Sequence, residues 1–219
     1  MNRLPAPVLR HLAALRALLV FTVICGVAYP LLVTAVAQAA FKHQADGSLI
    51  TNSKGQVVGS SLLCQEFVDA KGNPLPQYFQ PRPSNAIPAG ASNDYGCDPV
   101  QSGGSNLGTN SDKLKGQVAD RQKAMAAFDS VGGYTLTADQ VATDAVTASA
   151  SGLDPDISVL NAQQQEHRIA ATRGITVNQV DALVRANTGG RDLGILGEPG
   201  VNVLELNIAL DAKYPSTGK

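Results

Sequence analysis

The longest run of apolar residues lies near the N-terminus. From Ala17 to Phe41 there is no Asp, Glu, Lys, Arg or His in 25 consecutive positions. A helix of this length spans about 37 Å at 1.5 Å per residue, and the hydrocarbon core of a bilayer is about 30 Å thick. Residues 17–41 are therefore predicted to form a transmembrane helix, kinked at Pro30 because proline has no backbone N–H to donate.

The charges around this stretch predict its orientation. Three arginines and no acidic residue precede it. Positively charged flanks stay in the cytoplasm. The protein is therefore expected in the cell inner (plasma) membrane, with residues 1–16 as a cytoplasmic N-terminus. Residues 42–219 are then an extracytoplasmic, or periplasmic, domain. A cleaved signal peptide ending near Ala37-Gln38-Ala39 is an alternative, although signal peptides have apolar regions of only about 7–15 residues. A lipid anchor at Cys25 fits less well, because no small residue directly precedes that thiol.

After residue 41 the apolar pattern changes to short segments separated by turn residues. Residues 48–50 and 56–59 flank a polar stretch in which Gly55 can adopt a positive φ, so they are predicted to form a β-hairpin. Residues 72–110 are rich in Gly, Pro, Asn and Ser and show no sustained period. A loop of this length in a compact domain usually binds something or is ordered by a partner.

The C-terminal half predicts mainly helices. Helices in no regular alternation with strands indicate an α+β domain. A short apolar run at residues 145–148 is expected to be a buried strand. A first helix is expected from Asn110 or Ser111 to about Phe128, and a short turn of helix at the Thr137/Gln140 capping box. A second long helix is expected from Ser158 to about Arg173, where Gly174 ends it. The last two are expected from the Thr176/Gln179 capping box to about Asn187, and from Asn202, with Glu205 three residues later, to about Ala212.

Composition and charge exclude some classes of protein. The chain is 44% hydrophobic with a formal net charge of −1, which argues against disorder and against a dedicated nucleic-acid binder. All 18 acidic residues and 14 of the 17 basic residues follow residue 41, so the domain carries 14 − 18 = −4. Cys64 and Cys97 are the two exported thiols, and an oxidising compartment allows one disulfide between them.

The polar motifs predict no catalytic residue and no metal site. Residues 103–107 lack the last glycine of a serine-hydrolase elbow, and residues 102–108 lack the lysine of a phosphate-binding loop, so a tight turn that leads into the next helix is expected there. Asp154 and Asp156 lack the spacing of a calcium loop, and Asp156 is expected to charge the N-terminus of the Ser158 helix. Residues 163–165, three consecutive glutamines, are expected to lie on a solvated helix face.

These features describe a single-pass membrane protein with an extracytoplasmic α+β domain. That organisation is typical of an accessory subunit or of a free-standing membrane-anchored binding module that uses the loops of residues 72–110. An anchored hydrolase is a third hypothesis. The helix face around Gly26 and Pro30 carries several small residues, which suits close packing against a partner helix.

Several stretches together resemble the C chain of the Kdp-type potassium-transporting P-type ATPases, in order over nearly the whole chain. The similar residues are 26–34, 47–50, 59–62, 78–79, 82–84, 102–107, 147–155, 196–199 and 201–204, together with Gln65, Gln165, Arg168, Arg173 and Gly174.

This resemblance implies a non-catalytic subunit of a high-affinity potassium uptake complex. The implied partners are a channel-like potassium-binding subunit, an ATP-hydrolysing P-type subunit and a small hydrophobic peptide; potassium is the transported ion. The family is described as needed for assembly and as a catalytic chaperone that raises the ATP affinity of the hydrolysing subunit, with the glutamine that matches Gln165 implicated. The orientation predicted above places Gln165 away from cytoplasmic ATP. We therefore expect no firmly bound cofactor in this chain and an effect of ATP only through the complex.

Overall fold

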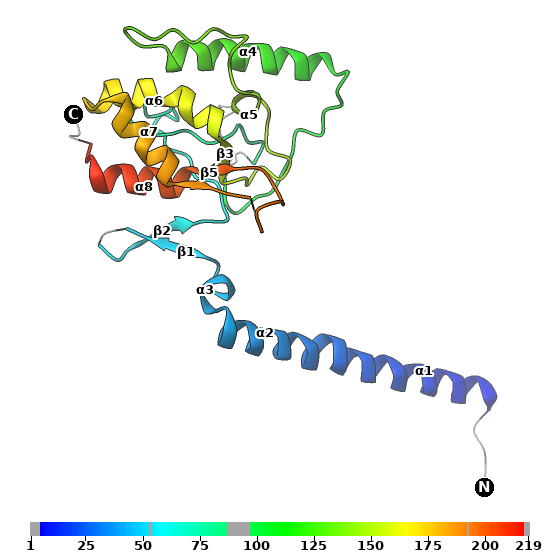
Figure 1. Ribbon diagram of the computed structural model, residues 1–219. Coiled ribbons are helices and arrows are strands. Elements are labelled where there is room, and N and C mark those ends of the chain that lie inside the picture. The colour runs from blue at the N-terminus through cyan, green and yellow to red at the C-terminus, as the bar shows by residue number, and fades with distance from the viewer. Residues whose placement is uncertain (1–4, 53, 87–96, 192, 217–219) are drawn as a thin grey trace. The chain divides into compact units, whose positions relative to one another are not determined.

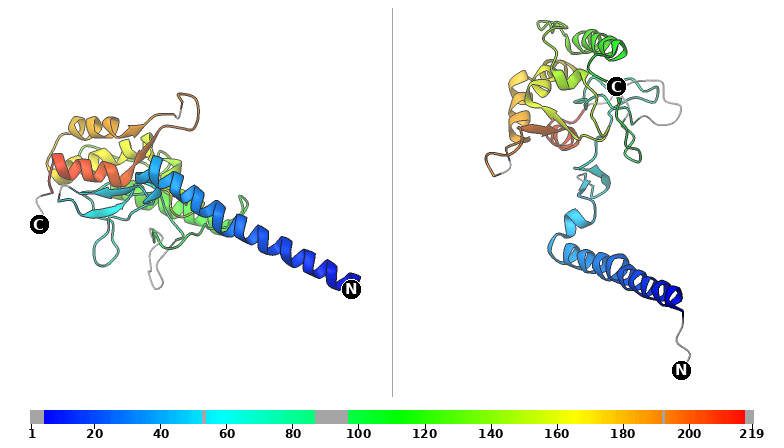
Figure 2. Two further views of the ribbon diagram at one scale, coloured as in Figure 1. Left: turned by 90° about the horizontal axis from the view of Figure 1, so that it is seen from below. Right: turned by 90° about the vertical axis from the view of Figure 1, so that its right-hand side faces the viewer.

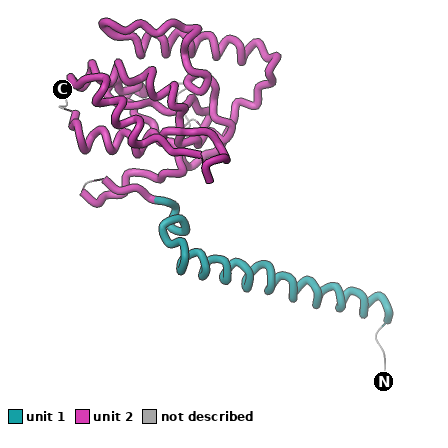
Figure 3. The backbone as a smooth tube through the Cα atoms, in the orientation of Figure 1, with its two compact units in different colours: residues 1–48 teal, residues 49–219 magenta. Residues whose placement is uncertain are grey.

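The fold is that of a computed structural model, which describes residues 5–52, 54–86, 97–191 and 193–216. It divides into two compact units, Met1–Ser48 and Leu49–Lys219 (Figure 3). Unit 1 is helical, and in its described residues unit 2 combines helices with two small antiparallel sheets (Figure 1). The prediction of one long apolar helix followed by an α+β domain is therefore confirmed.

Unit 1 contains a continuous helix through the apolar stretch. It consists of α1 (Ala6–Val23), the π-helical turn η1 (Ile24–Ala28) and α2 (Tyr29–Ala40), and α3 (Lys42–Ala45) follows it. Within the described part of the chain, Ala6–Ala40 is the one helix long and apolar enough to cross a membrane. It begins earlier than Ala17 because the preceding residues are also good helix formers.

The π-helical turn shows how the helix accommodates Pro30. The N–H of Tyr29 donates to the carbonyl of Ile24, five residues back, in the turn that directly precedes the proline. Proline removes one backbone donor, and a π-turn is one of the few ways to keep a helix continuous at such a point. Gly26 lies inside this turn.

Unit 2 begins with the predicted hairpin. Strands β1 (Leu49–Thr51) and β2 (Val57–Ser60) pair antiparallel, with Leu49 opposite Ser60. Gly55 has φ +74°, as the predicted turn requires. The side chain of Asn52 accepts hydrogen bonds from the backbone N–H groups of Lys54 and Gln56 and so closes the turn.

A second sheet lies in the C-terminal half. Its strands β3 (Asp156–Ser158), β5 (Gly200–Asn202) and β4 (Thr188–Gly189) pair antiparallel in the order β3-β5-β4. The strand predicted at residues 145–148 is wrong, because Ala145 and Val146 belong to the short helix α5 (Thr143–Val146). Both side chains are buried as expected, but a four-residue apolar run carries no period that separates helix from strand.

The longer helices follow their predicted caps. Ser111, Ser158, Thr176 and Asn202 each accept a hydrogen bond from the backbone N–H three residues later, and Gly174 ends its helix at φ +67°. Thr137 and Gln140 form only a turn, so the short helix expected there is wrong. The capped helices are α4 (Asp112–Asp129), α6 (Val159–Arg173), α7 (Val177–Ala186) and α8 (Val203–Lys213).

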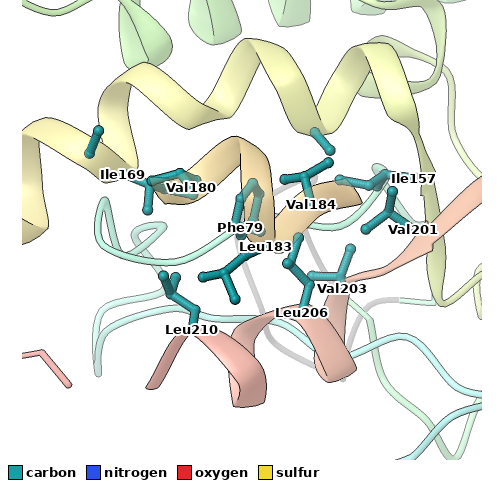
Figure 4. Close-up of a cluster of buried hydrophobic side chains, with 12 residues drawn as sticks. Phe79, Ile157, Ile169, Val180, Leu183, Val184, Val201, Val203, Leu206 and Leu210 are labelled. Atoms are coloured by element: carbon teal, nitrogen blue, oxygen red, sulfur yellow. The ribbon is translucent and has the colours of Figure 1, made fainter. Parts of the chain in front are cut away.

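Where the structure describes unit 2, two apolar clusters hold it together. The larger one joins α6, α7, α8 and the three-stranded sheet, and Phe79 from the long loop lies in its middle (Figure 4). The smaller one joins Met125 of α4 to Leu136 and to the residues around α5. Phe79 is fully buried, so the loop of residues 72–86 is part of the core and not only a surface connection.

Candidate functional site

Helix α6 carries the three consecutive glutamines, and their environments differ. Gln163 is exposed, whereas Gln164 is buried and the side chain of Gln165 is only 2% exposed. The expectation of a solvated face is therefore wrong for two of the three. Helix α6 packs against both α4 and α7, which leaves little of its circumference to solvent.

The side-chain amide of Gln165 uses all of its hydrogen-bonding positions. Its Oε1 accepts from the backbone N–H of Gln80 and from Nη2 of Arg168, both at 2.8 Å. Its Nε2 donates to the carbonyl of Gln80 at 3.2 Å and to Oδ1 of Asn161 at 2.9 Å. An amide offers two donor and two main acceptor positions, so the group is saturated inside the protein.

A second side-chain amide binds the same loop from α8. Asn207, also buried, accepts from the N–H of Phe79 and donates to its carbonyl, both at 2.9 Å. Asn207 and Gln165 thus hydrogen-bond the N–H and carbonyl of two successive loop residues, Phe79 and Gln80. The loop backbone is paired there as it would be in a β-sheet, but by side-chain amides. The two amides hold the Phe79 ring in the core, since its backbone would otherwise be buried without partners.

Arg168 continues this network one turn along α6. Its Nε donates to Asp129 Oδ1 at 2.8 Å, and its Nη1 donates to the carbonyls of Pro76 and Tyr78. The guanidinium also lies over the Phe128 ring, 4.3 Å from its centre. Burial raises the pKa of Asp129, and the adjacent guanidinium offsets part of that shift. The buried charges therefore compensate one another and fix the end of α4 to the loop.

The sequence contains a signal for part of this polar network. Asn161, Gln165 and Arg168 follow the i, i+4, i+7 spacing of one helix face. The same spacing in apolar residues indicates a buried stripe, whereas in polar residues it favours a solvated face. Gln80, Asn207 and Asp129 have no such signal, because each meets α6 or the loop only through tertiary packing.

The N-terminus of α6 is charged by a different residue from the one expected. Asp144 accepts from the N–H of Ser158 at 2.8 Å, from its hydroxyl at 2.7 Å and from Asn161 Nδ2 at 3.0 Å. Burial opposes ionisation of Asp144, but these hydrogen bonds outweigh it and lower its pKa. Asp156 lies in β3 instead, and Asp154 pairs with Arg82 at 2.6 Å.

Residues 102–108 do not form the tight turn expected of them. The N–H of Gly103 donates to the carbonyl of Ser151 at 2.8 Å, and the Ser102 hydroxyl donates to the same carbonyl at 3.0 Å. A Cβ at Gly104 would lie 2.5 Å from the carbonyl oxygen of Ala150. The segment therefore runs closely along residues 150–151, and the turn into α4 comes later, at residues 109–110.

The two cysteines of unit 2 are joined. Cys64 and Cys97 form a disulfide with a Cα–Cα distance of 6.0 Å, and both are buried. They border a cavity of about 510 Å³ with a mainly apolar lining from β1, β2, residues 63–66 and Val68. Among the described residues, no group of three or more His, Cys, Asp and Glu side chains is placed to hold a metal ion.

Gly26 has open space around it among the described residues of unit 1. A Cβ there would meet only Thr22 Cγ2 among them, at an ordinary contact distance of 3.9 Å. The π-helical turn before Pro30 does not require a glycine at this position for steric reasons. The side of the helix at Gly26 is thus free to accept a close neighbour.

Glu166, next to Gln165, is a buried carboxyl with one unpartnered oxygen. Within the described part of the chain its Oε1 is buried and has no hydrogen-bond partner. Burial raises its pKa to about 7, the charge of Asp181 adds to the shift, and Arg185 opposes it. Burial raises the pKa of Tyr134, and the charges of Asp129 and Glu166 add to that shift.

The raised pKa of Glu166 predicts a pH-dependent stability. The unfolded chain releases this proton near pH 4.5 and the folded chain near pH 7, so between these values the folded state holds the extra proton. Raising the pH from 5 to 8 should therefore lower the free energy of unfolding, by on the order of 2 kcal/mol. Urea titrations of the full chain in detergent should show this decline, and E166Q should reduce it by the share that Glu166 contributes.

The exposed Glu205 supplies the control for this experiment. E205Q should keep the wild-type decline, because that carboxylate is exposed. An equal decline in wild type and E166Q would show that Glu166 does not carry the proton.

The comparisons with known proteins agree with one another. The family model described as "KdpC: K+-transporting ATPase, c chain" matches residues 11–212. A relative from Mycobacterium bovis, named "Potassium-transporting ATPase KdpC subunit", is 48% identical over 200 residues, covering 91% of this chain and 96% of its own. Relatives of the same name from Citrifermentans bemidjiense and Geobacter metallireducens are 47% and 46% identical over 91% and 92% of this chain, covering 95% and 97% of their own.

The match spans the apolar helix of unit 1 and the polar network of unit 2. The family model covers most of both units, and the relatives are 46–48% identical over nearly the whole chain, which shows common ancestry for both units. The chain therefore belongs to the KdpC family, the c chain of K+-transporting ATPases.

Proposed function

We propose that this chain is the accessory subunit of a high-affinity, ATP-driven potassium uptake complex in the inner membrane. The membership of the family and the single apolar helix support this function. Its partners would be a channel-like potassium-binding subunit, an ATP-hydrolysing P-type subunit and a small hydrophobic peptide. The subunit would be needed for assembly and would itself carry out no chemistry.

Two independent observations support an extracytoplasmic position for unit 2. The arginines before the apolar stretch favour a cytoplasmic N-terminus. The buried disulfide between Cys64 and Cys97 is of the kind that persists in oxidising compartments and is rare in the cytoplasm. ATP is then on the other side of the membrane from this unit.

An effect on ATP affinity would have to pass through the complex. Gln165 is buried, and each of its hydrogen-bonding positions is already used within the chain. Its geometry therefore does not suit direct nucleotide contact. We infer that the subunit favours one conformational state of the assembled pump and changes the ATP affinity of the hydrolysing subunit by linkage. Gly26, with open space beside it, and the adjacent Pro30 turn would form the packing face for a partner helix.

Two measurements in cells that depend on this transporter at low potassium test the proposal. Deleting the chain should abolish high-affinity uptake, and the tagged chain should bring the ATP-hydrolysing subunit with it on purification. Q163C in a C25S background should react with a membrane-impermeant maleimide in intact cells, because residue 163 is exposed on α6.

Opposite results would separate the remaining hypotheses. Labelling of Q163C only after the membrane is permeabilised would overturn the extracytoplasmic position. A chain that purifies alone, with a small molecule in the cavity beside Cys64, would favour a free-standing membrane-anchored binding module. Turnover without any partner would favour an anchored hydrolase.

A further inference from the structure

Glu166 interrupts the apolar face that α6 turns toward α7. Ala162 lies four residues before it, Ile169 and Ala170 lie three and four residues after it, and all three are buried in the larger apolar cluster. On this shared face the whole Glu166 residue is only 5% exposed. The facing side of α7 contributes its buried valines and leucine to the same cluster (Figure 4). The carboxyl therefore lies where the two helices otherwise bury apolar side chains.

The charged side chains of α7 compensate this carboxyl only in part. Nε of Arg185 lies 3.0 and 2.9 Å from the two carboxylate oxygens of Asp181, one turn earlier on the same helix. Arg185 is mostly exposed and already paired, and the charge of Asp181 repels that of Glu166. Among the described residues, Oε1 of Glu166 has no hydrogen-bond partner. An ionised Glu166 would thus be a buried charge without a partner of its own.

The other elements that pack against α6 are α4, α5, β3 and β5. Asp156 of β3 is exposed, and β5 carries no titratable side chain. The buried or half-buried titratable groups on α4 and α5 have partners elsewhere: Asp129 with Arg168, Arg121 with the carbonyl of Val146, and Asp144 with Ser158. The charges that act on Glu166 come instead from Asp181 and Arg185. A change in the charge of Glu166 therefore affects chiefly the contact between α6 and α7.

Helix α7 is held on unit 2 by apolar packing. It lies at the edge of unit 2 in both views of Figure 2, where it is drawn in orange. In the described part of the chain, the side-chain hydrogen bonds of residues 176–188 all stay within that segment. Asp129 of α4 and Asn207 of α8, in contrast, form hydrogen bonds to α6 and to the loop. A helix of ten residues is marginal by itself, so α7 depends on the packing that Glu166 interrupts.

We propose that Glu166 and α7 form a pH-sensitive element, in which ionisation of the carboxyl releases α7 from α6 while the rest of unit 2 stays folded. The neutral carboxyl can remain between the helices, because burying a neutral polar group costs far less than burying a charge. The proton passes to solvent when α7 opens, and the carboxylate gains water. Alkaline pH therefore favours the open form. Where unit 2 is extracytoplasmic, which rests on the proposed function, the pH outside the cell sets this equilibrium.

The size of the effect follows from proton linkage. Burial raises the pKa of Glu166 to about 7 while α7 is packed, and a carboxyl in water keeps a pKa near 4.5. The open form therefore gains from ionisation over the whole range between these values and above it. Between pH 6 and pH 8, the equilibrium constant for release of α7 should rise by about tenfold.

Hydrogen exchange of the full chain in phospholipid nanodiscs measures this release. The readout is the protection factor, which corrects each amide for the intrinsic effect of pH on exchange. From pH 6 to pH 8, the protection of residues 177–186 should fall by about tenfold in wild type. Residues of α4 and α8 should keep their protection. E166Q, and also E166V, which restores an apolar side chain, should keep α7 equally protected at both pH values.

Q163E supplies the matched control, because it adds a carboxyl at an exposed position of the same helix. It should show the wild-type fall in protection of α7 and no further change.

Three results would overturn the proposal. Constant protection of α7 in wild type would show that ionised Glu166 does not release the helix. An equal fall in wild type and E166V would place the responsible proton elsewhere. A fall shared equally by α4, α6 and α8 would show general unfolding of unit 2 and no local element. The chain is measured without partners, so a failure of the proposed transport function would leave these outcomes unchanged.

Discussion

Replacing Gln165 by leucine should lower the free energy of unfolding of the full chain by about 3–5 kcal/mol. The leucine would leave four buried groups without their partner: the N–H and carbonyl of Gln80, Oδ1 of Asn161 and one N–H of Arg168. Each buried polar group left unsatisfied costs about 1–3 kcal/mol, and the charged one costs more. Rearrangement of the neighbouring groups and the burial of the apolar leucine side chain recover only part of this lost stability.

The neighbouring glutamine gives a matched control. Gln163 is exposed two residues earlier on the same helix, so Q163L should change the stability by less than about 0.5 kcal/mol. Urea unfolding in detergent, followed by circular dichroism, measures both variants. Equal stabilities for Q165L and Q163L would show that the amide network contributes nothing.

The same pair of variants separates a structural from a nucleotide-binding role of Gln165. Transporter complexes that still contain a folded Q165L subunit should keep the wild-type Michaelis constant for ATP, because the amide does not reach solvent. Fewer complexes should assemble, in proportion to the loss of folded subunit. A weaker ATP affinity in fully assembled Q165L complexes, with no loss of stability, would contradict this interpretation.

Reducing the disulfide should lower the free energy of unfolding by about 3–4 kcal/mol. The bond joins residues 33 positions apart, and opening a loop of that size returns a corresponding chain entropy to the unfolded state. Cys64 also anchors a second contact, since its N–H donates to the carbonyl of Leu153 at 3.1 Å. When the segment around Cys64 loosens after reduction, this hydrogen bond to Leu153 should weaken as well.

Unfolding with and without a reductant measures this effect. The double variant C64S/C97S should be about as unstable as the reduced wild type and should not respond to reductant. C25S, in the apolar helix, should behave as wild type in both conditions. If the reductant destabilised C64S/C97S as well, the loss would come from something other than this bond.

Many elements of the fold could be predicted because their signals are local. A cap needs one side chain and a backbone N–H three residues later, which is why Ser111, Ser158, Thr176 and Asn202 mark helix starts correctly. The same reason explains the hairpin closed at Gly55. The failed strand at residues 145–148 shows the limit, because burial of Ala145 and Val146 fits either a helix or a strand.

The polar network could be predicted only in part. The spacing of Asn161, Gln165 and Arg168 places them on one face of α6, but their polarity suggests solvent. Whether such a face is buried depends on what covers it, here the end of α4 and the loop at Gln80. Those partners lie 39 residues before Arg168 and 85 before Gln165. No local pattern relates positions so far apart.

The sequence by itself determined the apolar helix, the helix caps, the hairpin and the resemblance to the family, because each depends on neighbouring residues or on their order. Only the tertiary structure decided that Gln165 and Asn207 bind the loop and that Asp144 rather than Asp156 charges α6. It also brought Cys64 to Cys97 and left Leu193, Ile195 and Leu196 exposed. The physical reason is that burial and pairing of a polar side chain are properties of the assembled surfaces around it.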